Sequence, residues 1–185
     1  MENNKLQMRW LLISQNLVLF GSSMVFPYYI IFIKDVGANF TQFGFSYALF
    51  AISSALVHNL AGNLTDRFGK SLFLAISGWG TAIALLFFPA VTAIYQVYIL
   101  QVVMGGFAAF QKTAEKHLIA DITNFEGRGR QIGRYHFWTT LFSGLAVIVA
   151  GYAIDLFTLN IIFYVGSAFM FISGFFALKI KDKIL

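Results

Sequence analysis

Residues 62–70 read Gly62-Asn63-Leu64-Thr65-Asp66-Arg67-Phe68-Gly69-Lys70 and form a short charged connection between two long apolar stretches. Asp66 is an acceptor suited to a helix N-terminus or to a basic partner. Gly62 lets two helices approach closely, and Gly69 permits a tight turn at positive φ. The basic side chains of Arg67 and Lys70 are typical of a cytoplasmic loop. The stretch predicts a tight turn between two membrane spans, and an ordinary basic loop is the alternative.

The rest of the chain is strongly apolar. Of its 185 residues, 58% are hydrophobic and 11% are charged, whereas a soluble domain carries roughly 25% charged residues. A membrane-spanning helix needs about 20 apolar residues, and lipid cannot satisfy the polar groups of a non-helical backbone. The composition therefore excludes a soluble or disordered chain, and the apolar stretches lack the two-residue alternation of an outer-membrane barrel.

Charged residues and helix breakers divide residues 1–185 into six spans of a single transmembrane bundle, an all-α membrane protein. The predicted spans are 10–33, 42–62, 71–91, 95–119, 131–152 and 160–179. We expect Pro27 to kink the first span, which is too long for the core of a signal peptide and is interpreted as uncleaved.

Basic residues predict the orientation. With the N-terminus in the cytoplasm, 12 of the 13 Lys and Arg residues fall on the cytoplasmic side, and only Lys34 lies outside. The positive-inside rule then predicts an integral protein of the cytoplasmic membrane with both termini in the cytoplasm. The same bias excludes a protein that inserts in both orientations.

A short pattern occurs twice. Ala61-Gly62-x-x-x-Asp66-x-Phe68 follows the second span, and Ala150-Gly151-x-x-x-Asp155-x-Phe157 follows the fifth span, on the opposite side of the membrane. Two inverted three-helix repeats, as in many transporters, would produce this arrangement. A chance match of four positions is the alternative.

The motifs resemble those of one family. Residues 62–70 are similar to the G-x-x-x-D-R-x-G-[RK] loop of the major facilitator superfamily, and residues 101–109 are similar to its R-x-x-x-G-x-x-A-A pattern, with Gln101 in place of the Arg. Asp121 and the Arg128-Gly129-Arg130 run resemble the family's connection into the fifth span. The resemblance covers essentially the whole chain but corresponds to one six-span half of a twelve-span member. It implies a small-molecule transporter, secondary active or facilitative, that works by alternating access. It also implies a conformational-switch loop of Gly62, Asp66, Arg67, Gly69, Lys70, Asp121 and Arg128.

Polar side chains fall on one side of the first and fourth spans, which line the central cavity in the resembled family. The substrate-cavity candidates are Gln15, Asn16, Ser22, Tyr29, Gln101, Gly105 and Lys112. Hydrogen bonding between helices uses the same residue types and is the alternative.

Ionisable residues inside a membrane are costly and therefore suggest function. His58 and Glu115 are the candidates for proton coupling, although no Asp or Glu lies near the middle of a span. A hydrogen bond from His58 to a neighbouring helix, and a pair of Lys112 with Glu115 three residues later, are the structural alternatives.

Small residues mark one face of the second span and one face of the fifth. The dimer-interface candidates are Ala48, Ala51, Ala55, Gly144, Val147 and Gly151. In the resembled family these spans face the other half, so we expect a parallel homodimer of half-size units. Packing within one bundle is the alternative explanation of these faces.

The sequence is compatible with other transport roles. The chain could be a six-span substrate-binding subunit of a larger transport complex, or one half of a twelve-span transporter with a different partner half. An enzyme is not expected, because the three His residues lack a nucleophile elbow and metal-ligand spacing. No metal, cofactor or nucleic acid is expected, and the surroundings are membrane lipid.

Overall fold

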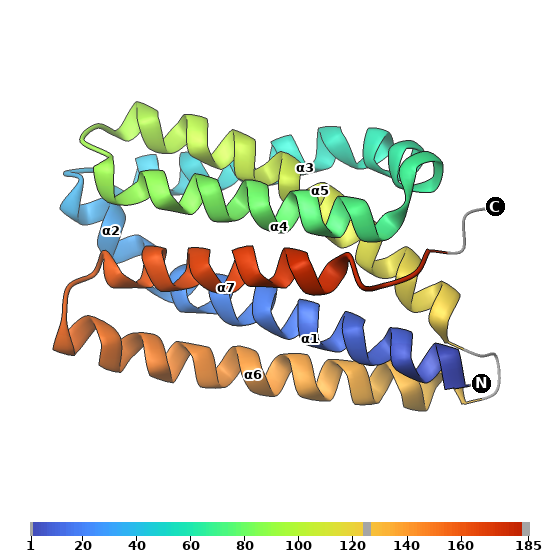
Figure 1. Cartoon of the computed structure of the whole chain (residues 1–185). Helices are drawn as coiled ribbons and strands as arrows, with labels where there is room; N and C mark the ends of the chain where they lie inside the picture. The colour runs from blue at the N-terminus through green and yellow to red at the C-terminus, as the bar shows by residue number, and fades with distance from the viewer. Residues whose placement is uncertain (1, 124–126, 183–185) are drawn as a thin grey trace.

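The computed structural model describes residues 2–123 and 127–182 as a bundle of helices (Figure 1). In chain order the elements are α1 (Glu2–Val25), η1 (Phe26–Tyr28), α2 (Tyr29–Asp35), α3 (Phe40–Phe68), α4 (Lys70–Phe87), η2 (Phe88–Ala90), α5 (Ile94–Ile122), α6 (Arg128–Leu156) and α7 (Ile161–Ala177). Among these described residues, five helical segments are long and apolar enough to cross a membrane. The sixth, α7, has 17 residues, which reaches the lower end of the range for spanning helices. Several helices extend beyond the predicted spans, and α1 begins at Glu2.

Local sequence explains where the helices stop. Pro27 lacks a backbone N–H, and the first span passes at this point from α1 through the 3-10 turn η1 into α2. Asn39 caps α3 through reciprocal bonds with Gln42, at 2.9 and 3.0 Å. Gly69 ends α3 with a φ of 100°, a conformation that side chains with a Cβ rarely adopt. The tight turn predicted at residues 62–70 is therefore shorter than expected, because α3 continues to Phe68 and α4 begins at Lys70.

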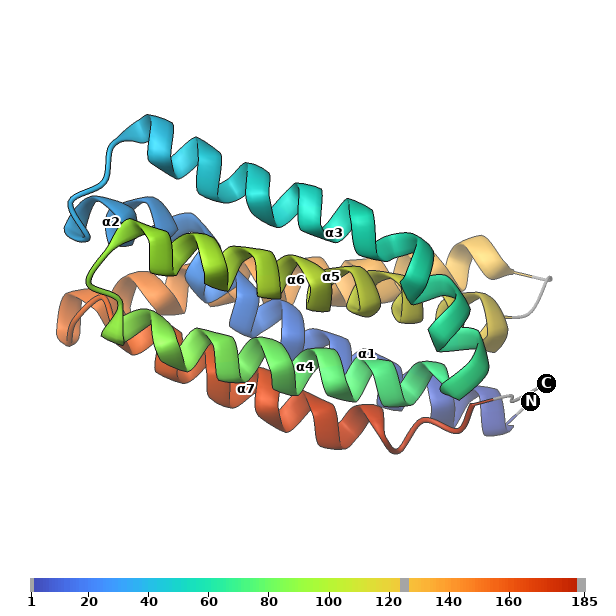
Figure 2. The ribbon, with the colours of Figure 1, turned by 90° about the horizontal axis from the view of Figure 1, so that it is seen from above.

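The six long helices form an arc in which each packs mainly against its neighbours, in the order α6, α1, α7, α4, α5, α3. Figure 2 shows α3 at one edge of the bundle. Every one of these neighbouring pairs joins a helix of the first half of the chain to a helix of the second half. Exchanging α1 with α5, α3 with α6, and α4 with α7 leaves the order of contacts unchanged. Inverted repeats would produce this pattern, and the repeat itself stays a prediction.

Two apolar clusters close the two ends of the bundle. Phe32, Phe88 and Phe163 are each at most 4% exposed, and their ring centroids lie 5.0–5.5 Å apart. At the other end, Leu11, Leu118 and Tyr135 belong to a second buried cluster. Such packing fixes the relative positions of the helices between the clusters.

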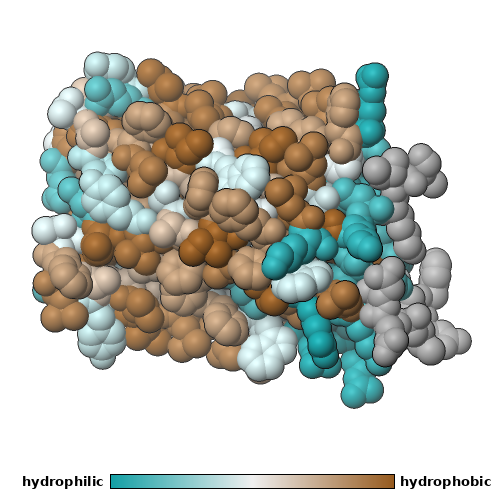
Figure 3. Space-filling view, in the orientation of Figure 1, coloured by the Kyte–Doolittle hydropathy of each residue, from teal (hydrophilic) through white to brown (hydrophobic). Residues whose placement is uncertain are grey.

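Hydrophilic side chains gather at one end of the molecule. Both termini, the turn at Gly69, the end of α5 and the start of α6 lie at this end (Figure 1). Figure 3 shows hydrophilic residues there and an apolar belt over the middle of the bundle. An apolar belt with a charged end is what an integral membrane protein requires.

Candidate functional site

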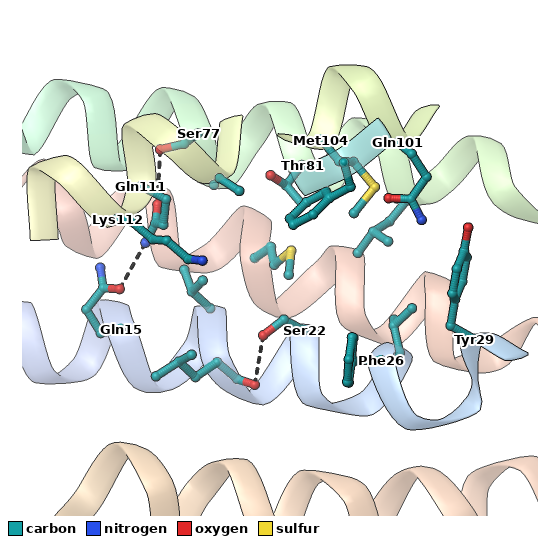
Figure 4. A pocket seen from close by; sticks show the side chains of 18 of the residues that line it. Gln15, Ser22, Phe26, Tyr29, Ser77, Thr81, Gln101, Met104, Gln111 and Lys112 are labelled. Carbon is teal, nitrogen blue, oxygen red and sulfur yellow. Dashed lines mark hydrogen bonds between the residues drawn. The ribbon is translucent and has the colours of Figure 1, made fainter. Parts of the chain in front are cut away.

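A cavity of about 310 Å³ lies between α1 and α5 (Figure 4). Side chains of α3, α4 and α7 complete its wall, and α6 contributes none of the lining residues. The volume is at the lower end of the range of about 300–1,000 Å³ for small-molecule sites. The cavity can therefore hold a small organic molecule.

Five of the seven predicted cavity residues line this space: Gln15, Ser22, Tyr29, Gln101 and Lys112. Asn16 and Gly105 are outside the lining. Gly105 instead packs against α3, where an ideal Cβ would lie only 2.3 Å from the Phe50 carbonyl oxygen. Asn16 lies one heptad before Ser23, whose hydroxyl hydrogen-bonds to Ser143 of α6. Asn16 therefore occupies the side of α1 that faces α6.

A chain of hydrogen bonds crosses the cavity wall from α4 through α5 to α1. Ser77 donates to Gln111 Oε1 at 3.0 Å, and Gln111 Nε2 donates to Gln15 Oε1 at 2.9 Å. Sequence reasoning missed Ser77, Gln111 and the lining residue Thr81. Ser77 and Thr81 share one helix face at i and i+4, and Gln111 directly precedes Lys112, so polar periodicity in the third and fourth spans could have indicated them.

The two proton-coupling candidates have polar partners. His58 Nδ1 lies 3.2 Å from Thr113 Oγ1, which joins α3 to α5. Glu115 lines the cavity and accepts a 2.6 Å hydrogen bond from the Tyr135 hydroxyl of α6. Within the described residues Lys112 forms neither an ion pair with Glu115 nor any other polar contact.

The predicted switch-loop residues from two distant stretches meet at the hydrophilic end. Lys70 Nζ lies 2.5 Å from Asp121 Oδ2, and Asp66 Oδ1 lies 3.3 Å from His117 Nδ1. Arg128 donates to Ala120 O at 2.7 Å, at the C-terminal end of α5. These contacts join the turn at Gly69 to the last turns of α5, and the end of α5 to the start of α6.

The other loop residues make fewer contacts. The Arg67 guanidinium lies over the Phe68 ring, 5.2 Å from its centroid. An ideal Cβ at Gly62 would have no neighbour within 4 Å. The close approach of two helices that we expected at Gly62 is therefore absent among residues 2–123 and 127–182.

Asp182 is a structural residue that sequence reasoning missed. It accepts hydrogen bonds from the Ser71 backbone N–H, at 3.1 and 3.2 Å, and from the Ser71 hydroxyl, at 2.6 Å. Its carboxylate thereby caps the N-terminus of α4 from the C-terminal segment. A capping partner more than a hundred residues away leaves no local sequence signal.

The dimer-interface candidates fall into two groups. Ala51, Ala55 and Gly144 are exposed, and Ala48 is half-buried. Val147 and Gly151 instead contact η1 of the same chain: the Tyr28 hydroxyl donates to Val147 O at 3.1 Å, and an ideal Cβ at Gly151 would lie 2.8 Å from that hydroxyl. The two groups therefore differ in what covers them and not in helix face, because Gly144 lies one heptad before Gly151 on α6.

The sequence model of the family described as Major Facilitator Superfamily matches residues 11–183. A Bacillus subtilis (strain 168) protein named "Uncharacterized MFS-type transporter YitZ" is 47% identical over 162 residues, which are 88% of this chain and 99% of the relative. "Multidrug resistance protein 1" of the same strain is 26% identical over 72% of this chain and 34% of its own length. "Quinolone resistance protein NorA" of Staphylococcus aureus is 29% identical over 63% of this chain and 30% of its own length. The chain thus spans about a third of the last two relatives and nearly all of the first.

Proposed function

The chain belongs to the major facilitator superfamily, and from that premise we propose that two copies pair in parallel to form a transporter that works by alternating access. Membership supports the transport of small molecules. Alternating access needs two bundles that rock about a central site, and one arc of six helices supplies one wall of such a site. The second copy would supply the other wall.

The outer faces of α3 and α6 carry this proposal. Each of these helices packs mainly against one neighbour, α3 against α5 and α6 against α1. Gly44 and Gly62 on α3, and Gly144 on α6, have no described atom beyond their local helix within 4 Å of an ideal Cβ. A glycine inside a helix costs about 0.5–1 kcal/mol relative to alanine. The packing of a single copy does not require these glycines, whereas close approach of a second bundle would.

The charge distribution supports a parallel arrangement. The hydrophilic end carries both termini and the basic residues around Gly69 and Arg128. Lys and Arg favour the cytoplasmic side of a membrane. Both copies would therefore insert in the cytoplasmic membrane with this end facing the cytoplasm. Two copies in the same orientation are related by a two-fold axis along the membrane normal.

Asp66 would connect the two copies. Its side chain is 63% exposed, although it lies beside His117, so it can reach a second bundle. We expect its carboxylate to approach the N-terminal end of α6 in the partner copy, where the helix dipole favours a negative charge. This contact would stabilise one of the two alternating states.

Disulfide cross-linking in native membranes tests the dimer. The chain has no Cys, so introduced pairs report cleanly. We would place one cysteine on α3, as in Ala51→Cys, and one on α6, as in Gly144→Cys, and sample neighbouring registers. A covalent dimer that recurs at helical periodicity is expected. Ile83→Cys is the matched control, because Ile83 is exposed on α4, away from the proposed interface. Monomer in every register would refute the homodimer.

Pairing of this chain with a different six-span half is a second possible arrangement. Two relatives are matched over only about a third of their length, as expected if the six-span unit can also pair with a different half. Monomer in every register, together with a covalent product at a different mass when a candidate partner is co-expressed, would favour that arrangement. Tight ligand binding by a monomer without transport would favour a substrate-binding subunit.

The cavity lining suggests an amphiphilic substrate. About half of its residues are apolar, and the others carry a polar or charged group. Two relatives carry drug resistance in their names, which agrees with a substrate of mixed apolar and polar character.

A further inference from the structure

One region of the cavity wall presents hydrogen-bond donors that lack an acceptor. Gln15 is 1% exposed, and its Oε1 already accepts from Gln111. Its Nε2 is buried and has no partner among the described residues. An unpaired buried amide group costs about 1–3 kcal/mol, so an acceptor from a bound molecule would be stabilising here.

Lys112 adds a positive charge to the same region. It follows Gln111 on α5, lines the cavity, and has no described polar partner. Figure 4 shows its side chain extending from α5 into the cavity, beside Gln111 and across from Gln15. A cation at membrane depth is costly unless it is paired or solvated. An anionic group of a ligand would provide that partner.

Glu115 is the other charged residue in the cavity lining. Its Oε1 is engaged by the Tyr135 hydroxyl at 2.6 Å, from the α6 side. No such bond holds the Lys112 ammonium within the described part of the chain. Of the two charged groups in the lining, the Lys112 ammonium is therefore the one without a described polar partner.

Large apolar side chains form much of the remaining wall and suit a hydrophobic body. These side chains come from six helical segments and include Phe26, Phe50, Leu85, Phe88, Met104 and Met170. Apolar surface removed from water contributes roughly 25 cal/mol per Å². Aromatic rings on this wall can also stack against a flat ligand.

We infer that the cavity takes an amphiphilic organic anion, with its carboxylate or a similar group between Lys112 Nζ and Gln15 Nε2 and its apolar body against the phenylalanines. This inference names the substrate class of the transporter proposed above and rests on that function. It follows from the unpaired donors and not from the names of the relatives. Each copy of the chain would supply one such subsite.

Three probes with one ring system separate charge from shape: 1-naphthoate, neutral 1-naphthamide and cationic 1-naphthylmethylammonium. We would titrate each into purified full-length protein in lipid nanodiscs by calorimetry and subtract the signal of empty nanodiscs. The wild-type protein should bind 1-naphthoate at least about tenfold more tightly than 1-naphthamide, since tenfold corresponds to only about 1.4 kcal/mol. The cation should bind most weakly.

The variants identify the group responsible. Lys112→Gln should remove the preference for 1-naphthoate and leave the Kd of 1-naphthamide within about twofold; unchanged 1-naphthamide binding also shows that the variant is folded. Lys112→Arg should keep the preference. Lys116→Gln is the matched control, because Lys116, like Lys112, is exposed on α5 but does not line the cavity.

Several results would overturn the inference. They are equal binding of the anion and the amide, a preference for the cation, a preference that survives Lys112→Gln, and binding of none of the three probes. These results are independent of the cross-linking experiment. A cross-linked dimer that transports neutral or cationic compounds would support the proposed function and refute the anion site. Anion binding by a protein that stays monomeric would support the anion site and refute the proposed homodimer.

Discussion

Replacing Gly105 with alanine should separate α3 from α5. An ideal Cβ at this position would lie 2.3 Å from the Phe50 carbonyl oxygen and 3.0 Å from Ser53 Cβ, whereas ordinary contact begins at 3.4 Å. The Phe50 oxygen belongs to the backbone and cannot rotate away. The facing segment of α3 therefore has to move by about 1 Å, and close-packed interiors resist such a shift.

The magnitude follows from two opposing terms. Overpacking a well-packed interior costs about 1–3 kcal/mol, and alanine gains about 1 kcal/mol over glycine from helix propensity. Because the collision involves backbone, we expect the upper part of that cost and a net loss of about 1–2 kcal/mol. At about 2–4 °C per kcal/mol for a chain of this size, Gly105→Ala should lower Tm by about 2–8 °C.

Gly106→Ala is the matched control at the next position. Its nearest atom would be Val57 Cγ2 at 3.9 Å, so the variant should melt at or slightly above the wild-type temperature. Tryptophan fluorescence during heating of the purified protein measures Tm for all three forms. A Gly105→Ala protein as stable as Gly106→Ala, but with altered substrate binding, would refute the packing role and return Gly105 to the cavity.

Three further predictions concern the hydrophilic end. Asp66→Asn should slow transport in proteoliposomes by about tenfold with little change in Tm, because the neutral amide loses the attraction between a carboxylate charge and the helix dipole; an unchanged rate would exclude the proposed contact. A double-mutant cycle of Lys70→Gln and Asp121→Asn, measured by thermal unfolding, should give a coupling free energy of about 1 kcal/mol, because solvent screens the partly exposed Asp121. Additive effects of the two substitutions would show that the ion pair contributes nothing to stability. Asp182→Ala should cost about 0.5–2 kcal/mol through loss of the cap on Ser71, with a lower Tm, whereas an unchanged Tm would show that water replaces the carboxylate.

The family and the all-helical class could be predicted from the sequence because they depend on local information. The charged turn at residues 62–70 has a recognisable motif, and the family match over residues 11–183 confirms that resemblance. Apolar length alone predicts helices, because lipid permits few alternatives. Exact helix ends were less accurate, since polar residues such as Glu2 continue a helix beyond the apolar stretch.

The cavity was only partly predictable, because periodicity gives a helix face but not the neighbour that covers it. Gln101 and Lys112 share a stripe with Gly105 on α5, yet the cavity extends to one side of that stripe, through Gln111 and Glu115. Gly105 lies on the opposite edge and meets α3. Helical periodicity does not indicate which edge of the stripe faces α3. The role of each residue therefore depends on packing between segments that are distant in the sequence.

The arc of helices described above has a consequence for biosynthesis. A nascent chain releases its N-terminal part first, so α1, α3 and α4 enter the bilayer before α5, α6 and α7 exist. In the finished protein, however, the main partners of the first three helices all belong to the second three. The early helices therefore lack their main partners at first. The side chain of Gln15, for example, can bind its partner Gln111 only after α5 has been made. Assembly can therefore begin only when α5 has been made, because α5 packs against both α3 and α4, whereas α1 has to wait for α6 and α7.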